Sequence, residues 1–468
     1  MTAVEKGQSS MTFQRAAFPH DFWWGTATAA YQVEGAVAEG GRSPSIWDTF
    51  AHTPGATHLG STGDVAADHY HRVAEDVAMM RDLGVNAYRF SIAWSRLLPG
   101  GVGLPNPEGV AFYRDLCERL REAGVTPMAT LYHWDLPQVL EDQGGWLNPR
   151  SPEWFAEYAD VAKTQLGDLV TTWSTLNEPW CSAFLGYAAG QHAPGRTAPA
   201  DGLVAAHHLL VAHHRALRAM RSARRQPEDR LGIVLNLIPA WPATDSPADH
   251  AAADAIDLVH NRLFADAVFH GRYPAAVLAL HNRYEVGDLI DPGELETARE
   301  PIDYLGVNYY NVNRVAYVEG APAPGPWPGA DGASIVRPPG RLTEMGWGVE
   351  PDGLVWTLAR VATEYPPTPI YICENGAAYP DEIGPDGEVD DPDRIAYLEG
   401  HIAAVAAAIE QGVDVRGYFV WSLMDNFEWA RGYEKRFGLV HIDRTTMART
   451  LKASGRWYRD FLSSTPVP

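Results

Sequence analysis

Four segments of the chain share one arrangement of polar and apolar positions. Each begins in a mixed stretch typical of a helix end, passes through a glycine, and continues as an apolar run rich in β-branched and aromatic residues. The glycine favours a left-handed helix cap, and the apolar run favours a strand buried on both faces. The pattern therefore predicts a repeated helix-to-strand unit. The four segments are residues 81–94, 121–134, 164–178 and 409–422.

Further apolar runs raise the number of predicted strands to eight; they lie at residues 22–28, 230–237, 302–310 and 369–376. Helical patterns such as 207–225 and 395–412 supply the crossovers that parallel strands require. Because no linker separates the units, we predict an α/β fold, a single (β/α)8 TIM barrel with elaborated loops at the C-terminal face of the strands. We expect this catalytic domain to span residues 17–468, after a short flexible N-terminus at residues 1–16.

Polar and aromatic residues stand where the predicted strands end. In a barrel of this kind, functional groups gather at the carboxyl ends of the strands. Any one of these residues could be polar merely because strand ends meet water, but that is a poor account of all of them together. The residues are Arg89, His133, Trp134, Asn177, Glu178, Asn236, Asn308, Tyr310, Glu374, Asn375 and Trp421.

Two of these residues are acids, Glu178 at the fourth strand and Glu374 at the seventh. These strands lie on roughly opposite sides of an eight-stranded barrel, so we expect the two carboxyl groups to face one another across a bound ligand. A spacing of about 5 to 5.5 Å favours direct attack on a sugar carbon, whereas roughly 6.5 to 9.5 Å leaves room for a water. The sequence alone leaves both spacings open.

Composition limits the possible ligands and the compartment. The 468 residues include 59 acidic and 37 basic side chains, for a net charge of −22, which disfavours nucleic acid and anionic membranes as partners and favours a neutral small molecule. No apolar stretch approaches a secretion signal or a membrane span. The three cysteines, Cys117, Cys181 and Cys373, are widely spaced. These features predict a protein of the reducing cytoplasm.

Several ordered motifs resemble those of the family 1 glycoside hydrolases, the β-glucosidase family. They are "FWWGTATAAYQVEG" (22–35), "YRFSIAWSR" (88–96), "YHWDLP" (132–137), "TLNEP" (175–179), "NYY" (308–310), "ENG" (374–376) and "WSLMDNFEW" (421–429). The resemblance covers nearly the whole chain. It implies that Glu178 is the general acid/base and Glu374 the nucleophile of a double displacement with retention of the β configuration. It also implies that no metal or organic cofactor is required.

The resemblance assigns further residues to the site. Arg89 and Tyr310 match family positions beside the nucleophile, where they would hold Glu374 ionised, and Asn308 is counted with these catalytic residues. Glu428 would contact the outer hydroxyls of the sugar and repel a 6-phosphate. Trp421 matches the stacking floor beneath the sugar and Trp347 a wall of the leaving-group site. The remaining residues of the implied sugar site are Gln32, His133, Trp134, Asn177, Asn236 and Trp429.

The implied activity is a β-glucosidase that releases terminal non-reducing β-D-glucosyl residues from cello-oligosaccharides or from aryl or alkyl β-glucosides. The alternatives are a β-galactosidase, a β-fucosidase or a transglycosylating enzyme of the same mechanism. A more distant alternative is a non-catalytic carbohydrate-binding protein on the same scaffold.

Tyr187 and Phe184 are plausible neighbours of the leaving group, or they simply pack within a loop.

Other features have plainer interpretations. Residues 319–341 are too rich in proline and glycine for regular structure, and we expect part of the entrance or a mobile loop there. His207 and His214 share a helix face but lack a third metal ligand, and the acidic run 379–394 is expected to be a solvated loop. Cys373 stands where most family members have threonine. If its thiol supports the site, activity would be sensitive to alkylation; if it points into the barrel wall, little changes.

Overall fold

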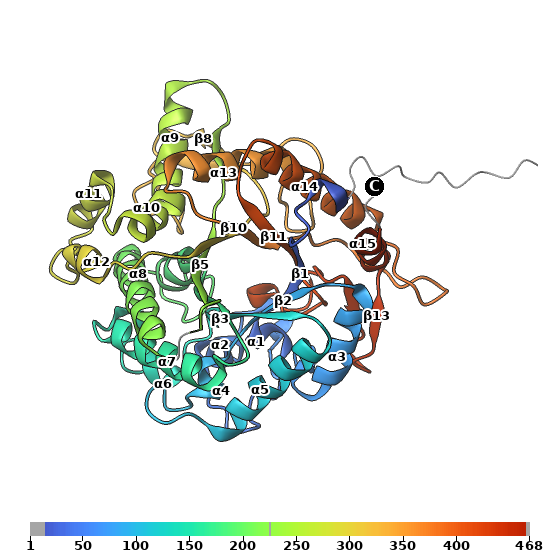
Figure 1. Cartoon of the computed structure of the whole chain (residues 1–468). Helices are drawn as coiled ribbons and strands as arrows, with labels where there is room; N and C mark the ends of the chain where they lie inside the picture. The colour runs from blue at the N-terminus through green and yellow to red at the C-terminus, as the bar shows by residue number, and fades with distance from the viewer. Residues whose placement is uncertain (1–14, 224–225, 465–468) are drawn as a thin grey trace, which may run out of the picture.

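The computed structural model describes residues 15–223 and 226–464. Eight parallel strands close into a barrel in the order β1-β11-β10-β7-β5-β4-β3-β2, and helices surround them (Figure 1). This arrangement confirms the predicted (β/α)8 fold. The barrel strands are β1 (Trp23–Ala27), β2 (Ala87–Ser91), β3 (Thr126–Tyr132), β4 (Thr172–Asn177), β5 (Arg230–Asn236), β7 (Tyr304–Asn308), β10 (Ile370–Asn375) and β11 (Val415–Trp421).

The helices bury their apolar faces against the outside of the barrel, and one large hydrophobic core runs through both layers. The longer helices are α3 (His69–Leu83), α5 (Pro107–Glu122), α7 (Ser151–Leu166), α8 (Pro199–Ser222), α9 (Pro247–Asp257), α10 (Leu263–His270), α11 (Ala275–Arg283), α13 (Pro351–Glu364), α14 (Pro392–Glu410) and α15 (Ala453–Ser463). The shorter ones are α1 (Ala30–Val33), α2 (Ile46–Ala51), α4 (Trp94–Leu97), α6 (Gln138–Glu141) and α12 (Gly293–Ala298).

The glycines of the helix-to-strand units follow the prediction in three cases and depart from it in one. Gly84, Gly124 and Gly412 have positive φ angles of 77°, 77° and 90°, the left-handed geometry expected of a helix cap. Gly167 instead has a φ of −67°. A Cβ atom at Gly167 would lie 2.3 Å from the carbonyl oxygen of Lys163, so this glycine is required by close packing rather than by backbone angle.

The expectation of no regular structure in residues 319–341 is wrong. Strand β9 (Ala333–Val336) lies in this stretch and pairs antiparallel with β8 (Asn313–Tyr317), which in turn pairs with β6 (Ala240–Pro242). The pairing partner, rather than the local composition, makes this segment a strand. A second small sheet, outside the barrel, joins β12 (Val440–Ile442) to β13 (Arg449–Leu451).

The expectation that residues 379–394 form a solvated loop is wrong for two of the acids in this segment. The side chains of Asp381 and Asp391 are buried, and these residues are only 1% and 4% exposed. Asp381 accepts hydrogen bonds from Arg394 at 3.0 and 3.1 Å and contacts Lys452, which also bonds Asp425 at 2.7 Å. Oppositely charged partners compensate the burial of these carboxylates. The cluster fastens the acidic loop to the segment that follows β11.

The predicted flexible N-terminus, residues 1–16, lies almost wholly outside the described residues, and the domain boundary at residue 17 stays a prediction. Within residues 15–223 and 226–464, none of the helices combines the length and the apolar character needed to cross a membrane.

Candidate active site

A cavity of about 510 Å³ opens at the carboxyl ends of the barrel strands. The predicted site residues that line it are His133, Trp134, Glu178, Asn236, Tyr310, Trp347, Glu374, Trp421, Glu428 and Trp429. The other four predicted residues, Gln32, Arg89, Asn177 and Asn308, are buried and bond to residues of the cavity wall. The structure therefore brings all of the predicted site residues together.

The backbone presents Glu178 at the point where β4 ends. Its φ angle is +46°, and its amide donates to the carbonyl oxygen of Val234 in the neighbouring strand β5 at 2.9 Å. Trp134 and Trp429, which also line the cavity, have φ angles of 78° and 48°. Left-handed backbone is unfavourable for such side chains, so the surrounding structure must hold all three in place.

Glu374 lies at the end of β10 between a cation and a phenol. The guanidinium of Arg89, from β2, donates from Nη1 to Oε1 at 2.6 Å, and the hydroxyl of Tyr310 donates to Oε2 at 2.7 Å. Arg89 is 1% exposed and Glu374 3%. Burial raises the pKa of Glu374, while Arg89 and Tyr310 act in the opposite direction because both stabilise the carboxylate.

Glu178 has no cation bonded to it among the hydrogen bonds of the described residues. Asn308 donates from Nδ2 to Oε1 at 2.7 Å, and the thiol of Cys181 donates to Oε2 at 3.1 Å. Burial, followed by the negative charge of Glu374, raises the pKa of Glu178 to about 8. The two acids of one cavity therefore have unequal surroundings, one bonded to a charged donor and one to neutral donors.

Asn177 connects the two glutamates. Its Oδ1 accepts from Arg89 Nη2 at 2.7 Å and from Asn308 Nδ2 at 3.1 Å, so its Nδ2 must be the atom that faces His133 Nε2 at 3.0 Å. Burial and the charge of Arg89 lower the pKa of His133 well below its usual value, so the ring is neutral and carries its proton on Nδ1. His133 Nδ1 has no hydrogen-bond partner among the described residues and is available to donate to a ligand.

Glu428 and Gln32 form a second polar group at the cavity. Gln32 Nε2 donates to the carbonyl oxygen of Phe427 at 2.9 Å and to Asn426 Oδ1 at 3.1 Å, and lies 3.5 Å from Glu428 Oε2. Gln32 Oε1 is buried without a partner among the described residues. Burial raises the pKa of Glu428 to about 8, with further contributions from the charges of Glu374 and Glu178.

Aromatic rings form the walls of the cavity. The rings of His133 and Trp421 lie 5.7 Å apart at an angle of 24°, and those of Trp134 and Trp429 lie 4.5 Å apart at 37°. Trp347 packs against Tyr310 at 5.4 Å and is only partly buried. Such flat apolar surfaces suit the C–H faces of a sugar ring.

The sequence prediction missed several residues of the cavity wall. Cys181 is the most informative, because its thiol contacts the carboxyl group of Glu178, three residues earlier in the chain. The others include Trp180, Gln191, His192 and Arg431.

Tyr187 and Phe184, the two plausible neighbours of the leaving group, are not among the residues that line the cavity. The hydroxyl of Tyr187 donates to Glu141 at 2.6 Å, and Glu141 does not line the cavity either.

The 319–341 segment contributes to the surroundings of the cavity through Trp327. Its ring lies 5.4 Å from that of Trp180, which lines the cavity, and its Nε1 donates to His260 Nδ1 at 3.2 Å. The described residues that line the cavity include none from 319–341, so Trp327 packs behind the wall, and the expectation that the segment forms part of the entrance stays a prediction.

Cys373 is fully buried, and its sulfur lies 2.7 Å from the position that a Cβ atom at Gly306 would occupy. Burial raises its pKa to about 12. Cys373 is not among the residues that line the cavity, and the thiol that contacts a candidate catalytic acid is Cys181.

The paired histidines of α8 bond to protein groups. His207 Nδ1 lies 3.1 Å from the hydroxyl of Tyr273, and His214 Nε2 lies 3.2 Å from the carbonyl oxygen of Ala267. Within residues 15–223 and 226–464, no three side chains among His, Cys, Asp and Glu are grouped as metal ligands.

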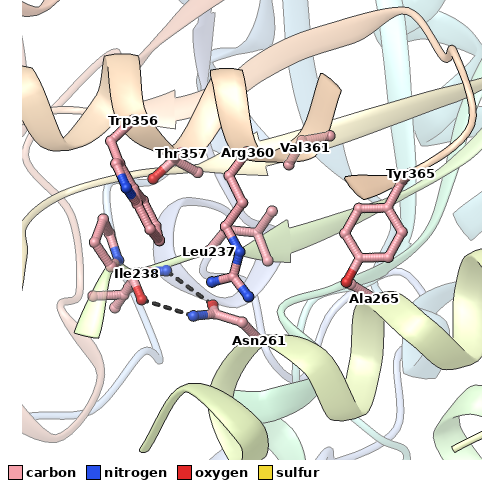
Figure 2. Close-up of a pocket in the computed structure, with 10 residues that line it drawn as sticks. Leu237, Ile238, Asn261, Ala265, Trp356, Thr357, Arg360, Val361 and Tyr365 are labelled. Carbon is pink, nitrogen blue, oxygen red and sulfur yellow. Dashed lines mark hydrogen bonds between the residues drawn. The ribbon is translucent and has the colours of Figure 1, made fainter. Parts of the chain in front are cut away.

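A second, much smaller pocket of about 20 Å³ lies beside the end of β5 (Figure 2). Asn261 holds the backbone of Ile238 there, accepting from its amide at 3.1 Å and donating to its carbonyl oxygen at 2.8 Å. The residues that line this pocket include no carboxyl group, and its volume is close to that of a single water site. This small pocket is therefore a packing feature. It lies behind the wall of the large cavity, because Ile238 lines both of them.

The barrel and the pair of unequal glutamates at its mouth define a class of enzyme, the glycoside hydrolases that work with two carboxyl groups. Residues 14–466 match the model of glycosyl hydrolase family 1. The chain belongs to this family, whose members are retaining β-glycosidases, and it is a glycoside hydrolase.

Individual relatives agree over nearly the full length. The chain is 47% identical over 459 residues to a bifunctional β-D-glucosidase/β-D-fucosidase of Bifidobacterium breve, covering 95% of this chain and 98% of that protein. The crystal structure of a psychrophilic β-glucosidase from Micrococcus antarcticus matches with a TM-score of 0.91 and 45% identity, over 95% of this chain and 97% of the other. A Thermotoga maritima β-glucosidase in complex with glucoimidazole matches with a TM-score of 0.89 and 43% identity, over 95% and 98% of the two chains.

Proposed function

We propose that this protein is a β-glucosidase that removes terminal β-D-glucosyl residues from cello-oligosaccharides or from aryl or alkyl β-glucosides. The observation that carries the proposal is the unequal environment of Glu178 and Glu374 in one sugar-sized cavity. Relatives named β-glucosidase, including that of Thermotoga maritima at 44% identity, support glucose as the sugar.

In the first step, Glu374 attacks the anomeric carbon as a carboxylate. Arg89 and Tyr310 support this role because they stabilise its negative charge. Glu178, whose pKa is raised to about 8, keeps its proton at neutral pH and transfers it to the departing oxygen. The bond to the leaving group breaks as the bond to Glu374 forms, which leaves a covalent glycosyl-enzyme with the α configuration.

In the second step, Glu178 is the carboxylate produced by that proton transfer. It accepts a proton from a water molecule, whose oxygen attacks the anomeric carbon and displaces Glu374. The two inversions give a product with the β configuration, and both glutamates return to their starting protonation states.

The sugar would be held by directional hydrogen bonds and one aromatic face. His133 Nδ1 is available as a donor and Gln32 Oε1 as an acceptor, since neither has a partner among the described residues. Trp421 would supply the apolar face. Glu428 would form hydrogen bonds with the outer hydroxyls of the sugar.

A β-fucosidase activity of the same site is the second candidate. The Bifidobacterium breve relative carries both activities in its name. Hydrolysis of galactosides depends on the orientation of a single hydroxyl group, and transfer to a second sugar depends on the fit of the acceptor. These two activities are the remaining alternatives.

A panel of nitrophenyl β-glycosides tests the proposal, with kcat/KM measured for the glucoside, fucoside and galactoside. We expect the glucoside to be turned over and Glu374→Ala to abolish the activity. Equal rates for wild type and this variant, or no turnover of any glycoside by the wild type, would contradict the proposal.

We further propose that residues 17–468 act as one catalytic domain in the cytoplasm. The three cysteines, Cys117, Cys181 and Cys373, are free and buried, which supports a reducing compartment. Fractionation of the source cells with activity in the soluble cytoplasmic fraction would support this location, and activity recovered only outside the cells would refute it.

A further inference from the structure

The thiol of Cys181 contacts the acid/base candidate directly. Cys181 begins the helical segment η4 (Cys181–Ala188), and its amide donates to the carbonyl oxygen of Glu178 at 2.9 Å. Its sulfur lies 3.1 Å from Glu178 Oε2, within range for an S–H···O hydrogen bond. Cys181 lines the cavity and is 6% exposed. Burial, with Glu178 beside it, raises the pKa of this thiol well above its usual value, so the sulfur keeps its proton.

The sulfur of Cys181 is held from the other side by Asn236, the last residue of β5. Asn236 Nδ2 lies 3.6 Å from the sulfur and can donate to it. Asn236 Nδ2 also lies 3.2 Å from His260 Nε2, but that nitrogen carries the ring proton and cannot accept a hydrogen bond. An amide proton can therefore face the sulfur lone pairs and leave the thiol proton to point at Glu178.

Asn236 is itself fixed by its surroundings. Trp327 donates to His260 Nδ1, so His260 Nε2 carries the ring proton and donates to the carbonyl oxygen of Asn236 at 3.1 Å. Ile238 lies two residues after Asn236, and Asn261 bonds both its backbone amide and its carbonyl oxygen (Figure 2). His260 and Asn261 thus hold the end of β5, which carries the amide that contacts the thiol.

We propose that Cys181 is a positioning residue for Glu178, whose S–H group holds Oε2 and stabilises the carboxylate form that acts as the base in the second step. This inference rests on the proposed function. Glu178 cycles between carboxylic acid and carboxylate, and an S–H donor favours the carboxylate. Four charged or titratable groups on other elements also interact with Glu178: Arg89, Tyr310, Glu374 and Glu428. A substitution of Cys181 alone leaves these four residues in place, so it isolates the effect of the thiol on the pKa of Glu178.

The first test compares Cys181→Ala, which removes the donor, with Cys181→Ser, which keeps one. The measurement is the pH profile of kcat/KM for a nitrophenyl β-glucoside. Loss of the donor raises the pKa of Glu178, so the basic limb of the Cys181→Ala profile is expected to move upward by about half a pH unit. Cys181→Ser should return the limb toward the wild-type position. Cys117→Ala, in the distant helix α5, is the matched control and should leave the profile unchanged.

The second test separates the two chemical steps. With a dinitrophenyl leaving group, which departs with little help from an acid, the second step limits kcat. Cys181→Ala is then expected to lower kcat by roughly two- to ten-fold, and Cys181→Ser to restore it. A change in KM alone, with the basic limb and kcat both unmoved, would overturn the inference and leave Cys181 a packing residue.

A spectroscopic measurement keeps the inference testable even where a variant loses activity. The S–H stretching band of Cys181 is identified in the infrared spectrum as the band that Cys181→Ser removes. We expect this band to move to higher wavenumber in Glu178→Ala, because the acceptor is gone; an unmoved band would overturn the inference. Wild-type enzyme that turns over no glycoside would instead refute the proposed function, so the two failures are distinguishable.

Discussion

The surroundings of Glu374 and Glu178 differ although both residues end a barrel strand at the same cavity. Glu374 is bonded to the guanidinium of Arg89 and the hydroxyl of Tyr310, whereas Glu178 is bonded to the amide of Asn308 and the thiol of Cys181. A full positive charge favours a carboxylate much more strongly than a neutral donor does. Burial raises both pKa values, and the bonded partners decide which acid loses its proton first. The different roles that we propose for the two residues thus rest on their neighbours, since the two side chains are chemically identical.

The largest expected effect comes from removing the attacking group. Glu374→Ala should lower kcat/KM for an aryl β-glucoside by roughly 10⁴-fold or more, because the covalent route is lost. Initial rates of nitrophenol release measure this. Glu410→Ala, an exposed acid at the end of α14, serves as control and should behave as wild type. Loss of less than tenfold in Glu374→Ala would mean that this residue is not the nucleophile.

The next largest effect is the dependence of the rate of a Glu178 variant on the leaving group of the substrate, which distinguishes the proton donor from the nucleophile. Glu178→Gln should slow the first step by roughly 10²–10⁴-fold for a poor leaving group, and far less for a dinitrophenyl group that needs no protonation. Added azide needs no general base, so it should accelerate the second step and yield a β-glucosyl azide. Rates that fall equally for all leaving groups would argue against Glu178 as the proton donor.

The pH profile sharpens the comparison further. We expect a bell whose basic limb lies near pH 8, because Glu178 must be protonated and its pKa is raised to about 8. The acidic limb reports ionisation of Glu374. Tyr310→Phe removes a donor from that carboxylate, raises its pKa, and should move the acidic limb upward by about one pH unit with little change in the basic limb. Movement of the basic limb alone would reverse the assignment of the two roles.

The smallest effect concerns Cys373 in the barrel wall. Its sulfur packs against Gly306, and its pKa is raised to about 12, so the thiol is unreactive at neutral pH. Iodoacetamide at pH 7 should therefore leave the activity of the native enzyme unchanged. Cys373→Thr should keep kcat/KM within about threefold and destabilise the fold by about 1–3 kcal/mol, because the branched side chain is overpacked against Gly306. Denaturant unfolding measures the stability. Rapid loss of activity with iodoacetamide in Cys181→Ser, which has no thiol in the cavity wall, would contradict this account.

The sequence was sufficient to predict the barrel and the set of residues at its mouth. Apolar runs at regular intervals predict buried parallel strands, and ordered motifs such as "TLNEP" and "ENG" place Glu178 and Glu374 at strand ends. The barrel and the residues at its strand ends could be predicted because they depend on local pattern and on the geometry common to all barrels. Gln32, Trp347, Glu428 and Trp429 were placed at the site only by the resemblance to the family, and the roles of all these residues stay predictions.

The features that the sequence prediction missed depend on partners far away along the chain. Strand β9 exists because β8 pairs with it, and Asp381 is buried because Lys452, 71 positions later, compensates its charge. Cys181 could not have been found in this way, because a lone cysteine carries no chemical signal until its sulfur is seen beside a carboxylate. The raised pKa of Glu178 likewise follows from burial in three dimensions.

The most direct test of the central claim is to trap the covalent intermediate. A 2-deoxy-2-fluoro-β-glucoside with a dinitrophenyl leaving group forms the glycosyl-enzyme but hydrolyses slowly, because the fluorine destabilises both transition states. After proteolysis, mass spectrometry should locate one fluoroglucosyl group on Glu374. A label on Glu178 or on any other residue, or active enzyme that acquires no label, would contradict the account.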